Sequence, residues 1–215
     1  MGTARDLIIL GTGVHGLEMA EIVRRINRER ATWNLLGYIA ADSQARRVGE
    51  IWCGLRVLGR LPVIEEHPDA LLVPDNEFPH EAPLARERLT SLVDPSTFVS
   101  PAARIGLGCV IYPNSFVGHN AVLGERVFAL AGSVVNHDDV LEDRVVLCSH
   151  VSLAGHVHVE ADCYLGQACT VRQFVRIGRG SLIGMGSVVL RDVEPDSVMV
   201  GNPARRLRER ERLTM

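Results

Sequence analysis

From residue 98 onwards, apolar residues recur at every sixth position of the chain. This series runs from Val99 to Val189, and all sixteen of its positions are apolar without one insertion. A second series, four residues after the first, runs from Ala103 to Val193, and fifteen of its sixteen members are small or β-branched. A period of six predicts a parallel β-helix, and small or β-branched side chains suit its narrow interior. The one charged member of the second series is Asp139.

The first ninety residues follow a different pattern. Short apolar runs, typical of buried parallel strands, occupy residues 7–10, 35–39 and 70–73. Helical spacing of Met19, Ile22, Val23 and Ile26 predicts a helix after the first run, and another helix is expected over about 81–91. This order predicts a small Rossmann-like α/β domain. The expected divisions are residues 1–92 for this domain, 93–200 for the β-helix and 201–215 for a C-terminal tail.

The first apolar run ends at the sequence GTGVHG, which satisfies the G-x-G-x-x-G pattern. Such a turn lets backbone N–H groups at a helix N-terminus approach a phosphate closely. The alternative is a tight turn without a ligand. The acid that binds ribose in dinucleotide sites, about 20 residues further on, has no counterpart before Asp42, and a domain of this size suits a mononucleotide better. The candidate substrate-binding residues are Gly11, Thr12, Gly13, Val14, His15 and Asp42.

Composition and charge exclude several classes of function. The net charge of −3 disfavours nucleic acid and anionic membranes as partners. The N-terminal apolar run is too short for a signal peptide or a membrane span. Five dispersed cysteines without C-x-x-C spacing indicate a reducing cytoplasm and no zinc knot. All 23 basic residues are arginine, which excludes Schiff-base lysine chemistry and a P-loop.

The sequence SVVNHDDV, residues 133–140, concentrates the candidate chemistry. An imidazole accepts a proton near neutral pH, and a neighbouring carboxylate can fix its tautomer. His137 on a coil corner beside Asp138 therefore suits a general base. The alternative is a hydrogen-bonded surface histidine without a catalytic role. Asn136 is expected to be a turn residue, and Asp139 is expected to be structural.

The hexapeptide repeat, the NHD sequence and the ending SVMVGNPAR resemble the acyl-CoA-dependent acyltransferases of left-handed β-helix type. Together with GTGVHG, they resemble the sugar O/N-acyltransferase family, which includes sialic acid O-acetyltransferases and N-acetyltransferases of nucleotide-linked aminosugars. The resemblance covers nearly the whole chain. It implies a homotrimer with acetyl-CoA, the cosubstrate, in clefts between neighbouring β-helices. It also implies a nucleotide-linked aminosugar on the N-terminal domain, and no metal is expected.

The resemblance also implies roles for individual residues. In that family three hexapeptides form one coil, so residues eighteen apart stack: His119 shares a column with His137, and Asp138 lies near His156. The family's catalytic histidine falls on His137, and the acid that raises its basicity falls on Asp138. The expected activity is acetylation of an amino group in bacterial glycan biosynthesis, in the cytoplasm. The expected acetyl-CoA-binding residues are Gly155, Gln167, Met185 and Gly186.

Three departures from the family pattern leave details open. Ala40 and Ala41 stand where many members carry an acidic pair, Val146 stands where some members carry a second histidine, and Pro74-Asp75-Asn76 replaces a Gly-Asn turn. The alternatives are a sugar O-acetyltransferase, a β-helix metalloenzyme of carbonic anhydrase type with histidine ligands from two chains, and a binding module without catalysis. A set of outward-facing apolar residues indicates a buried interface between subunits, namely Phe116, Phe128, Tyr164 and Phe174.

Overall fold

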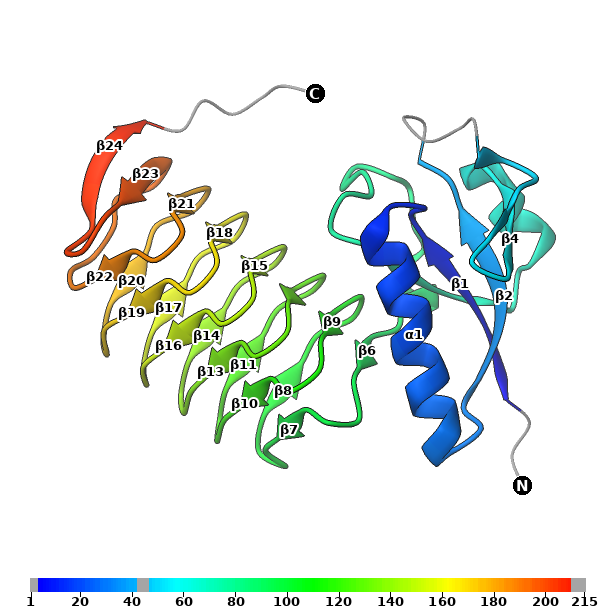
Figure 1. Cartoon of the computed structure of the whole chain (residues 1–215), viewed down its shortest axis with the longest axis horizontal. Coiled ribbons are helices and arrows are strands. Elements are labelled where there is room, and N and C mark those ends of the chain that lie inside the picture. Colours follow the sequence, from blue (N-terminus) through cyan, green and yellow to red (C-terminus); the bar gives the residue numbers. More distant parts are fainter. Residues whose placement is uncertain (1–3, 42–46, 210–215) are drawn as a thin grey trace. The chain divides into compact units, whose positions relative to one another are not determined.

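The computed structural model describes residues 4–41 and 47–209 of the chain (Figure 1). These residues form two compact units. The first runs to Pro95 and includes Leu107–Val110, and the second takes Ser96–Gly106 and the chain from Ile111 onwards. The boundary expected at residues 92 and 93 falls on a short strand, β6 (Leu92–Val93).

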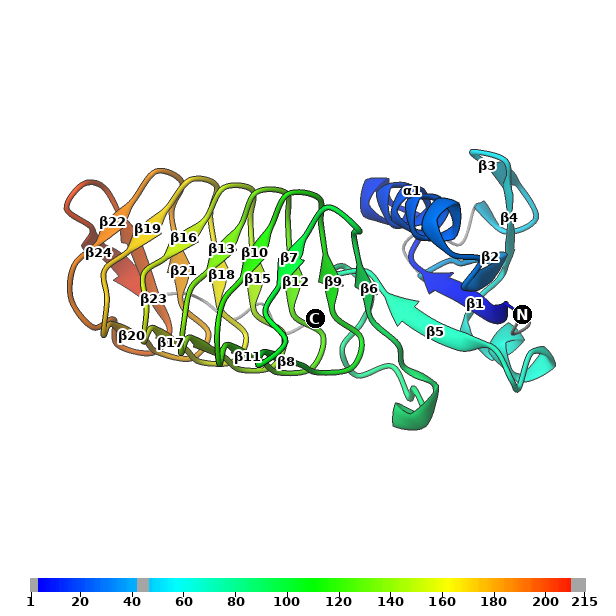
Figure 2. The same cartoon turned by 90° about the horizontal axis from the view of Figure 1, so that it is seen from below.

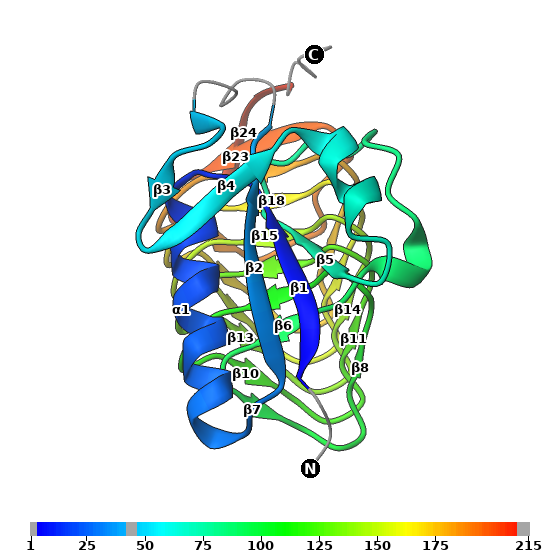
Figure 3. The same cartoon turned by 90° about the vertical axis from the view of Figure 1, so that its right-hand side faces the viewer.

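The first unit contains the predicted parallel sheet, with strands in the order β3-β4-β2-β1-β5 (Figure 3). Its four longer strands run parallel, and β3 pairs with β4 antiparallel. The chain moves from β1 to β2 on one side and later returns to β5 on the other. The order of the sheet therefore switches between β1 and β5, which is where open α/β sheets bind ligands. The bounds are β1 Arg5–Leu10, β2 Trp33–Ile39, β3 Ile51–Trp52, β4 Leu55–Gly59 and β5 Leu71–Pro74.

Helix α1 (Val14–Glu29) follows β1 directly, as predicted from its apolar spacing. Its buried face includes Met19, Ile22 and Val23, and the helix contacts β1 and β2. The opposite face of the sheet is covered by an apolar cluster that includes Leu10, Ile39 and Phe78. None of the helices in the described part of the chain is long and apolar enough to span a membrane.

The helix expected over about 81–91 is wrong. This segment forms turns and one short 3-10 helix, Arg86–Arg88, while another 3-10 helix lies at Leu61–Glu66. Pro83 disfavours helical geometry at the residue before it. The Arg88 guanidinium instead donates hydrogen bonds to the carbonyls of Ala70 and His67, at 3.1 and 2.7 Å, and Leu89 forms a parallel bridge with Leu72. These contacts fix the segment in an extended form against β5.

The second unit is the predicted left-handed parallel β-helix, with three parallel sheets as walls (Figure 2). Strands eighteen residues apart pair within each wall, as Phe116 does with Val134 and Val140 with His158. Wall 1 contains β7 Phe98–Val99, β10 Phe116–Val117, β13 Val134–Val135, β16 Ser152–Leu153, β19 Thr170–Val171 and β22 Val188–Val189. Wall 2 contains β8 Arg104–Ile105, β11 Val122–Leu123, β14 Val140–Leu141, β17 His158–Val159 and β20 Arg176–Ile177.

Wall 3 is closed by the antiparallel pair β23 and β24. Its strands are β9 Val110–Ile111, β12 Phe128–Ala129, β15 Val146–Leu147, β18 Tyr164–Leu165, β21 Leu182–Ile183, β23 Ser197–Val200 and β24 Arg205–Glu209. The walls meet at three edges, named here by the walls they join. Edge 1–2 contains residues 136–139 and their repeats, edge 2–3 contains 142–145, and edge 3–1 contains 166–169 and 184–187.

The two periodic series fill the interior of the coil. The first series is buried from Ile111 onwards and the second from Cys109 onwards. Cys109, Cys163 and Cys169 are buried fillers in this column, and burial raises the pKa of the Cys169 thiol to about 12. Phe128 pairs in the outward column with Val146, which pairs with Tyr164, but it is only 2% exposed because it packs against Tyr112 with ring centroids 5.4 Å apart, so it adds no exposed apolar surface.

Candidate functional site on a coil edge

The residues of SVVNHDDV form the turn at edge 1–2 between β13 and β14. Asp139 is fully buried beneath this turn. One carboxylate oxygen accepts the backbone N–H of Asn136 and the other accepts that of Val157, both at 2.7 Å. Burial raises the pKa of Asp139 to about 6, against the opposing effect of these two hydrogen bonds. Asp139 therefore links the turn to the next coil by hydrogen bonds and fixes the backbone conformation around His137.

His137 and Asp138 form a hydrogen-bonded pair on the outside of the same turn. His137 Nδ1 lies 2.9 Å from Asp138 Oδ2, and Asn120 Nδ2 donates to Asp138 Oδ1 at 3.2 Å. The hydrogen bond from His137, followed by that from Asn120, lowers the pKa of Asp138. An ionised carboxylate only accepts hydrogen bonds, so His137 carries its proton on Nδ1. The lone pair on Nε2 is then available to accept a proton.

Gly155 lies one coil beyond His137 in the same column. A Cβ atom at this position would lie 2.4 Å from Cε1 and Nε2 of His137. The imidazole therefore occupies the space that any side chain at 155 would need. In the part of the chain that the structure describes, no backbone acceptor is found for the Gly155 N–H.

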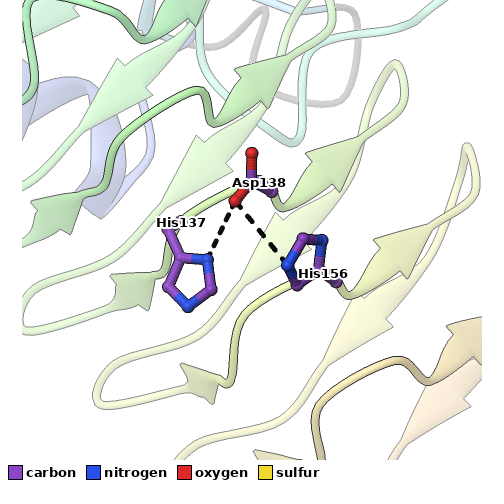
Figure 4. A group of neighbouring side chains, drawn as sticks. All are labelled: His137, Asp138 and His156. Carbon is purple, nitrogen blue, oxygen red and sulfur yellow. Dashed lines mark hydrogen bonds and ion pairs between the residues drawn. The ribbon is translucent and has the colours of Figure 1, made fainter.

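His156 continues the arrangement along edge 1–2 (Figure 4). His156 Nε2 lies 3.7 Å from Asp138 Oδ2, the same oxygen that His137 Nδ1 contacts. The two imidazoles meet edge to face, with ring centroids 5.2 Å apart, and Phe174 stacks on His156 at 4.9 Å. Sequence reasoning placed His156 near Asp138 but gave it no role, and it took Phe174 only as an interface residue. The eighteen-residue spacing was the signal that links them.

The expected acetyl-CoA residues do not all come together in one chain. Gly155 lies at edge 1–2 beside His137, whereas Gln167, Met185 and Gly186 lie at edge 3–1. Met185 is 75% exposed there, and the Gly186 N–H donates to the Gln167 carbonyl at 2.8 Å. The whole of wall 1 separates these two groups within one β-helix.

The N-terminal turn joins β1 to α1, as predicted. Gly13 is the N-cap of α1, without a side-chain cap hydrogen bond. Gly11 has a φ of 123°, and a Cβ on Gly16 would lie 2.5 Å from the Gly11 carbonyl oxygen. The fold itself therefore requires the two outer glycines. Of the other predicted substrate residues, Thr12 is buried, Val14 is 68% exposed, His15 lies 3.3 Å from Glu18, and Asp42 lies outside the described residues.

Asp75, directly after β5, lies against this turn at the switch of the sheet. A Cβ on Gly11 would lie 1.9 Å from Asp75 Oδ2, and Asp75 is only 3% exposed. Its Oδ1 accepts the Glu77 N–H at 3.0 Å, while Oδ2 is buried without a hydrogen-bond partner among the described residues. Burial raises the pKa of Asp75 to about 6. Beside this edge of the sheet lies a cavity of about 180 Å³, lined by Ala40, Ala41, Leu61, Phe78, Pro79 and Ala82.

One group of described side chains has the composition of a metal site. His137, Asp138 and His156 each offer a ligand atom, and these atoms lie within 4.8 Å of one another.

A larger cavity of about 380 Å³ lies at edge 2–3, but its charged lining residues are paired with one another or with neighbours. Arg144 binds Asp162, and Glu142 binds Arg179 and His158.

The sequence matches no protein-family model. Among curated proteins, it is 48% identical over 59 residues to the acyl-(acyl-carrier-protein)–UDP-N-acetylglucosamine O-acyltransferase of Agrobacterium fabrum. That match covers 27% of this chain and 22% of the relative, so the chain spans about a fifth of the length of the relative.

Solved structures match almost the whole chain. The acetyltransferase domain of PglB from Neisseria gonorrhoeae is 25% identical with a TM-score of 0.80, and the match covers 94% of this chain and 100% of that one. A histidine-to-asparagine variant of perosamine N-acetyltransferase from Caulobacter crescentus, in complex with CoA and GDP-perosamine, is 26% identical with a TM-score of 0.81, covering 97% and 98%. The resemblance drawn from the sequence is thereby confirmed: over almost its whole length the chain has the fold of hexapeptide-repeat sugar acetyltransferases, and the curated proteins that it matches in part include acyltransferases.

Proposed function

We propose that this protein transfers the acetyl group of acetyl-CoA to the amino group of a nucleotide-linked aminosugar. The observation that carries the proposal is the His137–Asp138 pair, in which an ionised carboxylate 2.9 Å away holds the Nδ1 proton and leaves Nε2 as a base. The matched structures from two bacteria support an acetyl donor and a sugar acceptor, because one is an acetyltransferase domain and the other an aminosugar N-acetyltransferase.

In the proposed reaction, the amine nitrogen of the sugar attacks the thioester carbonyl carbon of acetyl-CoA. His137 Nε2 takes a proton from that nitrogen as the N–C bond forms. The negative charge that develops on the carbonyl oxygen can be met by the Gly155 N–H, for which no backbone acceptor is found in the described chain. The C–S bond then breaks, and the CoA sulfur receives the proton from His137. The products are an N-acetylated sugar nucleotide and CoA.

The proposed acetyl-CoA site needs two chains. Gln167, Met185 and Gly186 lie at edge 3–1, while the proposed base lies at edge 1–2 of the same β-helix. A cosubstrate that contacts both groups must therefore bridge two β-helices. Closed three-fold packing makes three equivalent clefts of this kind, so we propose a homotrimer. Exposed apolar side chains support burial against another subunit, with Phe98 at 55%, Phe116 at 37% and Tyr164 at 38% exposure.

We assign the nucleotide to the turn at the start of α1. The helix has a glycine N-cap and no side-chain cap, so its positive end can meet a phosphate. The matched Caulobacter structure holds GDP-perosamine, which supports a sugar nucleotide as the class of acceptor. Thermal-shift measurements with UDP-, dTDP-, GDP- and CMP-sugars identify the base, because a ligand bound only to the native state raises its melting temperature. We place the reaction in the cytoplasm.

The decisive test is replacement of His137 by Ala. We expect kcat to fall by roughly 10²- to 10⁴-fold, the usual contribution of a general base, while acetyl-CoA still binds. His158→Ala is a matched control, because His158 Nε2 also lies 2.9 Å from a carboxylate, that of Glu142, but on another part of the coil. The control should keep the wild-type rate. A near-normal rate for His137→Ala at neutral pH would contradict the assignment.

Two other activities are separated by direct measurements. An O-acetylated product is cleaved by hydroxylamine, whereas the amide expected here is not. The metal-ligand set of His137, Asp138 and His156 gives a specific reason to test the metalloenzyme alternative. We expect acetyl transfer to continue after treatment with a chelator, and loss of activity that zinc restores would favour a metal mechanism instead.

A further inference from the structure

We propose that His156 and Phe174 are positioning residues for the His137–Asp138 pair. The inference rests on the proposed function, in which His137 is the general base. Asn120, Asp138, His156 and Phe174 are eighteen residues apart and form one column along edge 1–2, called here the edge column. Each has a positive φ, between 57° and 64°. Backbone hydrogen bonds between successive turns hold this column in register, such as that from the His156 N–H to the His137 carbonyl at 3.1 Å.

Asp138 is restrained by three side chains, two of them from the edge column. Asn120 donates to Oδ1 at 3.2 Å, His137 bonds to Oδ2 at 2.9 Å, and His156 Nε2 lies 3.7 Å from the same Oδ2 atom. His156 also meets the ring of His137 edge to face. A rotation of the Asp138 carboxylate or of the His137 ring therefore has to displace His156. This arrangement keeps the lone pair of His137 Nε2 in one direction.

Phe174 restrains His156 in turn. The phenyl ring stacks on the imidazole with centroids 4.9 Å apart and planes inclined by 16°. The side chain of His156 is 44% exposed, so without this stack its ring has few other contacts to fix its plane. The contacts thus run without a break from Phe174 through His156 to Asp138 and His137.

The position of Phe174 is unfavourable for protein stability. Its φ is 64° and its side chain is 70% exposed, so it occupies a left-handed conformation without burying its ring in the core. Bulky residues are genuine outliers in this region, and asparagine, aspartate, histidine and glycine are preferred there. Those preferred types occupy many of the other edge turns, for example Asn114, Asn120, Gly132 and His150. Strained residues that persist next to a reacting group point to a functional contribution.

The test is Phe174→Asn, which places a residue suited to positive φ at this turn and removes the stack. We expect kcat to fall about tenfold, as small displacements of a reacting group cause, with no change in the KM for acetyl-CoA. The melting temperature should rise, so destabilisation cannot explain the slower reaction. Phe174→Tyr keeps the ring and should keep the wild-type kcat. Arg126→Asn, at a turn of edge 2–3 with φ 56°, is the matched control and should leave kcat unchanged.

A double-mutant cycle tests whether the two residues act through one another. His156→Ala should lower kcat at least as much as Phe174→Asn does, and Phe174→Asn should have no further effect in the His156→Ala background. Independent effects of the two substitutions, or an unchanged kcat for Phe174→Asn, would overturn the inference. So would dissociation of Phe174→Asn into monomers on sedimentation, which would make Phe174 an interface residue. If His137→Ala keeps its rate in the same assay, the proposed function fails instead.

Discussion

At the scale of single residues, the position of the His137 ring depends on the lack of a side chain at the equivalent position of the next coil, Gly155. His119, His137, Gly155 and Gln173 occupy equivalent positions in successive coils. His119 and Gln173 carry large side chains at this position, so the backbone of this turn does not require glycine. Glycine is needed at 155 because the ring of His137 lies over it, 2.4 Å from where a Cβ would be.

We therefore expect Gly155→Ala to displace the His137 ring without unfolding the coil. The added methyl group must push the imidazole away from Asp138, and a misplaced base lowers kcat by about 10- to 100-fold. Steady-state kinetics measure the loss, and circular dichroism should show an unchanged fold. Gln173→Ala, in the same column, should react at the wild-type rate. A wild-type kcat for Gly155→Ala would show that the position of the ring does not matter.

At the scale of elements, two buried aspartates with the same pKa shift stabilise the fold differently. Burial raises the pKa of both Asp75 and Asp139 to about 6. A raised pKa favours the protonated folded state, so each contribution to the free energy of unfolding is complete below pH 3.8 and is lost as the pH rises through about 6. Both oxygens of Asp139 accept backbone N–H groups, whereas Oδ2 of Asp75 has no partner among the described residues.

Asp75→Asn should therefore stabilise the protein at pH 7.5, by about 1 to 3 kcal/mol, because a shift of one pKa unit corresponds to about 1.4 kcal/mol. The loss of stability between pH 4.5 and 7.5 should also become smaller than in the wild type. Asp139→Asn is the comparison: its amide NH₂ would face a backbone donor, so this variant should be less stable at pH 7.5. Urea unfolding at the two pH values measures both effects. An unchanged pH dependence for Asp75→Asn would contradict the role given to burial.

The sequence predicted the elements whose interior contacts repeat. The period of six depends only on which side chains fit inside the coil, so the hexapeptide strands and the eighteen-residue pairing are found as expected. The non-repeating segment after β5 was predicted as a helix, because its structure depends on hydrogen bonds from Arg88 to distant carbonyls. The burial of Phe128 depends likewise on one ring, that of Tyr112, which no period reveals.

In the candidate site too, contacts set by the repeat were predicted from the sequence, whereas contacts between distant segments were not. The His137–Asp138 hydrogen bond joins adjacent residues and was expected from the sequence, and the proximity of His156 follows from the repeat. The close approach of Asp75 to Gly11 of the N-terminal turn could not be predicted from the sequence, since it depends on how β5 is placed beside β1. The packing role of Gly11 and Gly16 could not be predicted from the sequence either. The motif suggests that these glycines let a phosphate approach the backbone, whereas in the structure the close contacts of the turn leave no room for a Cβ atom at either position.

At the scale of the whole molecule, one β-helix presents His137, the proposed base, and the expected acetyl-CoA residues on different edges. Each complete site in the proposed trimer therefore takes His137 from one chain and Met185 from another. Sedimentation should give about three times the chain mass of 23.6 kDa. An active monomer would contradict a shared site, because wall 1 lies between the two groups within one chain.

Mixing two inactive variants gives the sharpest test of this arrangement. His137→Ala lacks the base, and Met185→Arg is expected to block acetyl-CoA at edge 3–1, where Met185 is 75% exposed. When equal amounts are unfolded together and refolded, a site is complete only where an intact His137 faces an intact Met185 on the neighbouring chain. Random assembly makes about a quarter of the sites complete, because each of the two conditions holds for half of the chains. Each variant refolded alone should stay inactive. If both residues served a site within one chain, every chain would carry one defect and the mixture would show no activity.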